Sequence, residues 1–181
     1  AIAAWPEAPT VLLREHYRCH PKIINFCNQK FYGGKLIVMT EDHEEPDVLT
    51  MYRTAPGNHA RGHLNQRQID VIREEVLPRL ERKGYESIRI ITPYRDQVAA
   101  IQTQLGRTLE VATVHKFQGR EKDAIVLTSV DNVITDFVDD PRMLNVAVSR
   151  AVKSLTVITS QDPQNDRTNY GDLARYIEYN N

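Results

Sequence analysis

The sequence predicts an α/β domain of three layers, in which helices cover both faces of a mainly parallel sheet. Short apolar runs rich in β-branched residues recur along the chain, and such runs are typical of buried parallel strands. Amphipathic stretches separate these runs, and the alternation of strand and helix indicates a parallel sheet. A chain of 181 residues is long enough to bury the core that this sheet needs.

The predicted strands are short, and polar or Gly- and Pro-containing turns bound them. The intervening polar segments, including residues 40–46, 53–62 and 131–140, are predicted loops. In chain order, we expect strands at residues 10–13, 48–52, 88–91, 111–114, 124–130 and 155–159.

The predicted helices carry apolar residues at intervals of three or four positions. Pro21 suits the first turn of a helix, because its missing N–H has no intrahelical partner there, and Gly33 and Gly34 end this helix. Pro78 falls late in the second helix, where we expect a kink. In chain order, we expect helices at residues 21–32, 64–83, 98–105, 143–152 and 173–179.

Composition excludes several classes of protein. The 23 basic and 24 acidic residues nearly balance, so any contact with nucleic acid must be local. Cys19 and Cys27 show no disulfide framework and indicate a reduced, intracellular protein. No apolar run approaches the roughly 20 residues that span a bilayer, and residues 1–9 resemble no signal peptide. The chain has no initiator Met, and we expect it to be a piece of a longer protein.

The polar segment at residues 115–123 is the first candidate site. It lies between two predicted strands and carries His, Lys, Gln, Gly, Arg and Glu, which can bind anions and sugars. In open α/β sheets, ligands bind at the carboxyl ends of the strands, where we expect this segment to lie. A solvated charged loop is the alternative.

Three polar clusters flank predicted strands and could meet along one edge of the sheet: Tyr17 with Arg18, residues 118–121, and Arg150. Two guanidinium groups, a carboxylate and a phenol ring suit a nucleoside triphosphate. Arginine binds phosphate oxygens in a bidentate manner, a carboxylate accepts from ribose, and a tyrosine ring stacks on a base. Taken singly, Arg150 also fits a surface salt bridge, and Tyr17 fits packing.

A second set of residues could contact a nucleic-acid backbone. Hydroxyl, N–H and basic groups at strand ends position phosphates without reading sequence, and a tyrosine ring can stack on a single strand. The alternative for residues 92–94 is a Pro-containing turn with a partly buried Tyr. The set comprises Thr92, Tyr94, Arg95, Thr113 and His115.

Other chemistries are less well supported. The sequence has no GxxxxGK[ST] phosphate loop and no apolar strand ending in Asp-Glu, so it does not cradle a triphosphate and Mg²⁺ by itself. His16, Cys19 and His20 do not form a metal site on one helical face, because the residue before Pro21 is driven out of the α region.

A nuclease site would need clustered acids beside a basic residue. Such acids in a polar loop more often face solvent. The candidates are Asp136, Asp139 and Asp140, with Glu121 and Lys122.

Four motifs, at residues 16–21, 91–94, 114–123 and 144–151, occur in an order that closely resembles motifs IV, IVa, V and VI of superfamily 1 helicases. The branch that the chain resembles most is 1B, which includes the nonsense-mediated-decay helicase and senataxin-like enzymes. The resemblance extends from about Leu12 to Ser160. It implies a single RecA-like domain over residues 1–181, with a P-loop NTPase-like fold that lacks its own phosphate loop and with peripheral segments at 1–9 and 161–181.

By motif match, the resemblance implies that ATP binds between this domain and a first RecA-like domain of the same parent chain, which would hold the Mg²⁺ ligands. Tyr17 would lie against adenine, Arg18 would reach the γ-phosphate, and Glu121 would bind ribose. Gln118 and Gly119 would line the cleft, and Arg150 would be an arginine finger.

Single-stranded DNA or RNA would be the partner, with 5′ to 3′ translocation, and the isolated chain would be inactive. Two residues depart from the family pattern: Cys19 replaces Met, and His115 replaces an acid found in some relatives. A non-catalytic nucleic-acid- or protein-binding module that retains the fold is the alternative.

Overall fold

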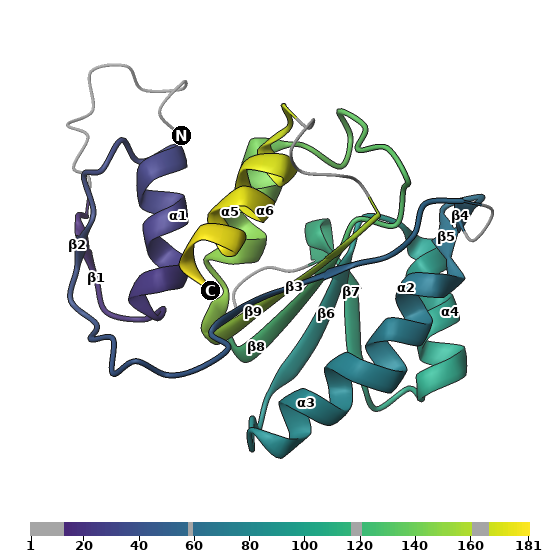
Figure 1. Ribbon diagram of the computed structural model, residues 1–181. Coiled ribbons are helices and arrows are strands. Elements are labelled where there is room, and N and C mark those ends of the chain that lie inside the picture. Colours follow the sequence, from purple (N-terminus) through teal and green to yellow (C-terminus); the bar gives the residue numbers. More distant parts are fainter. Residues whose placement is uncertain (1–12, 58–59, 117–120, 161–166) are drawn as a thin grey trace.

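One fully parallel sheet forms the centre of the computed structural model, which describes residues 13–57, 60–116, 121–160 and 167–181 (Figure 1). Its five strands lie in the order β3-β9-β8-β6-β7. The predicted parallel sheet is confirmed. The strands are β3 (Leu49–Arg53), β6 (Ile88–Thr92), β7 (Glu110–Thr113), β8 (Lys122–Thr128) and β9 (Ala151–Thr159).

Helices cover both faces of this sheet. On one face lie α1 (Pro21–Phe31), α5 (Pro141–Val148) and α6 (Asn169–Asn180); on the other lie α2 (Gln66–Val71), α3 (Leu77–Arg82) and α4 (Arg95–Leu105) (Figure 1). Successive strand residues point to opposite faces, so Ile91 joins the core beneath α1, α5 and α6, whereas Ile90 joins the core beneath α2 to α4. The predicted three-layer, RecA-like α/β fold is confirmed.

The second predicted helix is continuous but not uniform. A π-helical turn, η2 (Ile72–Val76), joins α2 to α3, and the N–H of Leu77 donates to the carbonyl of Ile72. Pro78 follows in the first turn of α3. Because Pro has no N–H and clashes with the preceding turn of an α-helix, the wider π turn accommodates it without ending the helix.

Several predicted boundaries are wrong. Residues 60–65, assigned to a loop and a helix start, form the hairpin of β4 (Ala60–Arg61) and β5 (Leu64–Asn65). The helix predicted at 143–152 ends at Val148, because Ala151 pairs with Lys122 and begins β9.

The amino-terminal part differs as well. Most of the strand predicted at 10–13 lies outside the described residues. A small parallel pair that the sequence did not indicate, β1 (Glu15–His16) with β2 (Ile37–Val38), lies beyond α1 (Figure 1).

In the part of the chain that the structure describes, no helix has the length and apolar character needed to cross a membrane.

Candidate functional site

The predicted site residues lie at two opposite edges of the sheet. Glu121 and Arg150 come directly before β8 and β9, at the amino ends of these strands. Thr92 and Thr113 are the last residues of β6 and β7, and they are register partners at the carboxyl ends. All five strands are parallel, so the connection from β7 to β8 must return from one edge to the other. The prediction that residues 115–123 lie together at the carboxyl edge is therefore wrong for Glu121.

At the amino edge, four residues form what we call the amino-edge cluster: Arg18, Cys19, Glu121 and Arg150. The Nε of Arg18 lies 2.7 Å from Oε1 of Glu121. The N–H of Lys122 donates to the carbonyl of Arg150 over 3.1 Å, which places the chain beside Glu121 against the end of α5. The sequence predicted that three polar clusters meet along one edge, and within the described residues the structure brings Arg18, Glu121 and Arg150 together there.

Cys19 is the fully buried member of this cluster. Its thiol donates to the carbonyl of Ser149 over 3.2 Å, and the residue is fully buried. Burial raises the pKa of Cys19 to about 12, while Arg18 and Arg150 lower it and Glu121 raises it. Cys19 is therefore an uncharged residue of the core at neutral pH.

Arg150 has an unsatisfied polar atom. Its Nε is buried and has no hydrogen-bond partner, and it forms no ion pair within the described residues. The alternative of a surface salt bridge has no support in this part of the chain. Leaving a buried donor without an acceptor costs about 1–3 kcal/mol, and an anionic ligand oxygen would remove this cost.

Tyr17 is close to Arg18 in sequence but lines a different hollow. Its side chain is 66% exposed and its hydroxyl donates to Glu15, so the alternative that it packs in the core is wrong. The hollow beside Tyr17 is formed with Leu13, Arg14, Glu15 and Ile37. Gln118 and Gly119 lie outside the described residues.

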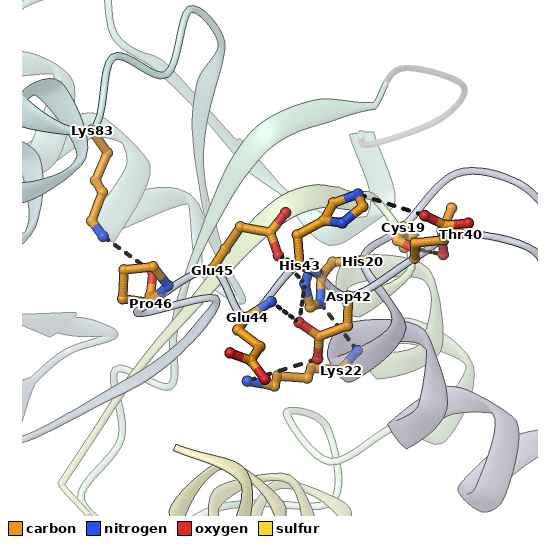
Figure 2. A network of polar contacts seen from close by, with 11 residues as sticks. Cys19, His20, Lys22, Thr40, Asp42, His43, Glu44, Glu45, Pro46 and Lys83 are labelled. Atoms are coloured by element: carbon orange, nitrogen blue, oxygen red, sulfur yellow. Dashed lines mark hydrogen bonds and ion pairs between the residues drawn. The ribbon is translucent and has the colours of Figure 1, made fainter.

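His20 caps α1 and takes part in a polar network with the acidic segment that follows β2 (Figure 2). Its Nδ1 accepts from the N–H of Lys22 over 3.2 Å, so its Nε2 carries the proton. That Nε2 lies 3.1 Å from a carboxylate oxygen of Glu45 and 3.4 Å from one of Asp42.

The atoms of His20, Asp42 and Glu45 are close enough to hold a cation. However, an ion at Nε2 would move the proton to Nδ1, where the N–H of Lys22 already points. The other two residues weighed for a metal have separate partners. His16 Nε2 accepts from the N–H of Cys19 over 2.9 Å, and the thiol of Cys19 donates to the carbonyl of Ser149. The hydrogen bonds therefore favour a helix cap over a metal site.

At the carboxyl edge, four rings form what we call the aromatic column: His63, Tyr94, Phe137 and His115. The rings of His63 and Tyr94 stack at 4.2 Å between centroids and 9° between planes. Tyr94 and Phe137 stack at 5.7 Å and 22°, and His115 lies 6.3 Å from Phe137. The predicted turn with a partly buried Tyr is present, but the turn also borders a pocket.

This pocket has a volume of about 400 Å³ and collects most of the residues predicted to contact nucleic acid. Thr92 is the exception, because its side chain is fully buried. Sequence reasoning missed five lining residues, His63, Pro93, Asp96, Lys116 and Phe137. The pocket is lined by these, with Tyr94, Arg95, Thr113 and His115.

The residues considered for a nuclease site do not assemble. Asp140 caps α5 by accepting from the N–H groups of Arg142 and Met143, and Asp139 accepts from Tyr170 at the start of α6. Glu121 pairs with Arg18 at the opposite edge. That alternative is wrong.

Residues 2–162 match the family model described as the AAA domain. The chain belongs to this family. The resemblance to the C-terminal RecA-like domain of superfamily 1 helicases of the nonsense-mediated-decay type is likewise confirmed.

Curated relatives cover nearly the whole chain. A mouse protein named 5'-3' DNA helicase ZGRF1 is 28% identical over 93% of this chain. A regulator of nonsense transcripts 1 homolog from Neurospora crassa is 31% identical over 82% of it. The chain spans only 10% and 16% of these two proteins.

A crystal structure of the C-terminal domain of a possible DNA helicase from Lactobacillus plantarum is similar in fold. It has a TM-score of 0.56 at 14% identity, with 79% of this chain and 86% of that chain covered. At this identity the likeness shows the fold alone, and it agrees with the three-layer architecture.

Proposed function

We propose that this chain is the second RecA-like half of an ATP-dependent helicase, and that its amino-edge cluster forms one wall of a nucleotide site. The observation that carries the proposal is that Arg18, Glu121 and Arg150 meet at one edge of the sheet, where the Nε of Arg150 has no acceptor among the described residues. Guanidinium groups bind phosphate oxygens, and a carboxylate binds ribose hydroxyls.

Each residue then has a distinct part. Arg150 stabilises charge that develops on the transferred phosphoryl group, and Arg18 binds the γ-phosphate. Glu121 accepts from ribose and, through its ion pair, fixes the direction of Arg18. The exposed ring of Tyr17 is available to adenine, and Gln118 and Gly119 complete the cleft.

The residues at this edge fit ATP better than they fit its metal ion. Mg²⁺ needs hard oxygen ligands, and in the amino-edge cluster the one carboxylate, Glu121, is paired with Arg18. We therefore assign the Mg²⁺ ligands and the phosphate loop to a first RecA-like domain. The metal ion would neutralise charge on the phosphates there.

A single strand of DNA or RNA would follow the opposite edge, over the pocket beside the aromatic column. Arg95, Thr113 and His115 line that pocket and can contact phosphates without reading sequence. The buried side chain of Thr92 is not among the proposed contacts.

ATP hydrolysis tests the proposal. The isolated chain should hydrolyse no ATP, whereas a protein that carries it with a phosphate-loop domain should hydrolyse ATP when a single strand is added. In that protein, Arg18→Ala and Arg150→Ala should abolish hydrolysis. Arg142→Ala, an exposed change at the other end of α5, should have no effect. Normal hydrolysis by both site variants would contradict the proposal and favour a non-catalytic binding module.

A further inference from the structure

We propose that Phe137 is a stacking platform for one unpaired nucleobase, and that Tyr94 and His63 are positioning residues that hold its ring in place. This inference rests on the proposed function, since it names how the carboxyl-edge pocket would hold a single strand. It also reassigns the stacking that the sequence predicted for Tyr94.

Phe137 is an exposed ring on a fixed support. Its side chain is 55% exposed, although neighbouring Ile134 and Val138 are buried in the core. The N–H groups of Val138 and Asp139 both donate to the carbonyl of Thr135, at 3.0 and 2.9 Å, which closes the turn around Phe137. An apolar ring held out of the core in this way can contact a ligand with little loss of conformational freedom.

Tyr94 braces Phe137 from within the protein. The Tyr94 ring already stacks on both Phe137 and His63, and its hydroxyl donates to Oδ2 of Asp131 over 2.6 Å. Burial and this hydrogen bond raise the pKa of Tyr94 to about 12, so the phenol remains a donor at neutral pH. Tyr94 is therefore engaged on several sides, and Phe137 has the more exposed ring.

His63 occupies a conformation that histidine rarely adopts. It follows Gly62 at the tip of the β4–β5 hairpin. The φ angle is +53° at Gly62 and +63° at His63. Two successive positive φ angles suit a two-residue hairpin turn in which Gly, Asn or Asp is usual. At this turn the ring of His63 lies parallel to the ring of Tyr94.

The surroundings of Phe137 match a single strand better than a neutral small molecule. The pocket of about 400 Å³ lies within the size range of ligand sites, and the exposed basic residues Arg95 and Lys116 line it. Among the described residues that line it, Asp96 is the one acid. An aromatic platform with flanking cations is the arrangement that binds bases and phosphates of single strands without reading sequence.

The test compares two strands that differ only in their bases. Binding of the 181-residue chain to oligo(dT) of about 12 nucleotides is measured beside binding to an abasic strand of equal length. Phe137→Ala should weaken binding to oligo(dT) about tenfold and leave the abasic strand unchanged, since one base–aromatic stack is lost. Phe137→Tyr should retain the preference for oligo(dT). Val133→Ala, which removes another exposed apolar side chain of the same loop, should change neither affinity.

The ratio of the two affinities also tests the positioning role. His63→Ala should lower the affinity for oligo(dT) relative to that for the abasic strand, and His63→Tyr should keep this ratio near the wild-type value. A general loss of folding would instead weaken binding to both strands. Oligo(rU) in place of oligo(dT) tests whether the platform accepts RNA as well.

Equal effects of Phe137→Ala on both strands would overturn the platform while leaving the nucleic-acid surface in place. A wild-type chain that binds neither strand would overturn the proposed surface itself, and the platform with it.

Discussion

The guanidinium Nε of Arg18 lies 2.7 Å from a carboxylate oxygen of Glu121, although one residue precedes the first helix and the other precedes β8. The pair forms at the amino edge, where the chain beside Glu121 also meets the end of α5 and Arg150. The proposed nucleotide contacts and the proposed nucleic-acid contacts therefore lie at opposite ends of the parallel strands.

The ion pair between Arg18 and Glu121 should matter more for nucleotide binding than for stability. The two side chains are 41% and 39% exposed, and exposed pairs contribute less than about 1 kcal/mol. Glu121→Gln should therefore lower the free energy of unfolding, measured in urea, by less than that amount, while the KM for ATP rises in a protein that contains both domains. A loss of several kcal/mol with an unchanged KM would make Glu121 a structural residue.

His16 should make stability depend on pH. Burial is the larger cause that lowers the pKa of His16 from 6.5, and the charge of Arg18 is the smaller one. The charge of Glu121 opposes this shift. The unfolded chain therefore takes up a proton at a higher pH than the folded chain. The contribution of neutral His16 to stability is therefore complete above pH 6.5. It is lost as the pH falls below 6.5, because the unfolded chain is protonated first. Protonation would also remove the acceptor for the N–H of Cys19.

The measurement is the free energy of unfolding between about pH 7 and pH 5, the range in which histidine titrates. His16→Gln should flatten the decline, whereas the same change at exposed His43 should leave it unaltered. An identical slope in wild type and His16→Gln would contradict the assignment.

Substitution of Asn65 should lower the free energy of unfolding more than substitution of other polar residues near the carboxyl edge. It is 1% exposed, its Oδ1 accepts from the N–H of Gln68 at the start of α2, and its Nδ2 donates to the carbonyl of Val130 over 2.7 Å. Asn65→Ala removes a helix cap and leaves a buried carbonyl unpaired, so it should cost about 2–4 kcal/mol in urea unfolding. Asn65→Asp retains the cap but buries a carboxylate oxygen against the carbonyl of Val130, so it should cost at least as much as Asn65→Ala.

Gln104→Ala, an exposed change on α4, is the matched control and should stay within about 0.5 kcal/mol of wild type. If Asn65→Ala proved as mild as this control, the buried network would not hold the hairpin to the sheet.

The sequence was sufficient for the architecture because the strands are buried on both faces. Residues 90–91 and 124–127 are apolar throughout, and the Gly and Pro residues around these runs mark the turns. The convergence of Arg18, Glu121 and Arg150 was also predicted. Their placement at the amino edge was not, since periodicity does not show how a connection returns across a sheet.

The aromatic column was invisible in the sequence for a related reason. His63 fell between the loop predicted at 53–62 and the helix predicted at 64–83, and Phe137 was one apolar residue within an acidic segment. Only the pairing of β4 with β5 and the burial of Ile134 and Val138 bring these rings to Tyr94. Gly62 was a weak turn signal that could have been used. The predicted end of the helix at residue 152 was wrong because Ala151 pairs with Lys122 of β8 and begins β9.

The most direct test of the nucleotide site is the rate of hydrolysis of enzyme-bound ATP in a single turnover, measured with the two-domain protein and a saturating single strand. Arg150→Ala should slow this step by about a thousandfold or more while ATP still binds, because the guanidinium group acts on charge that develops during transfer. Arg142→Ala should leave the rate unchanged. A single-turnover rate for Arg150→Ala equal to that of wild type would contradict the account.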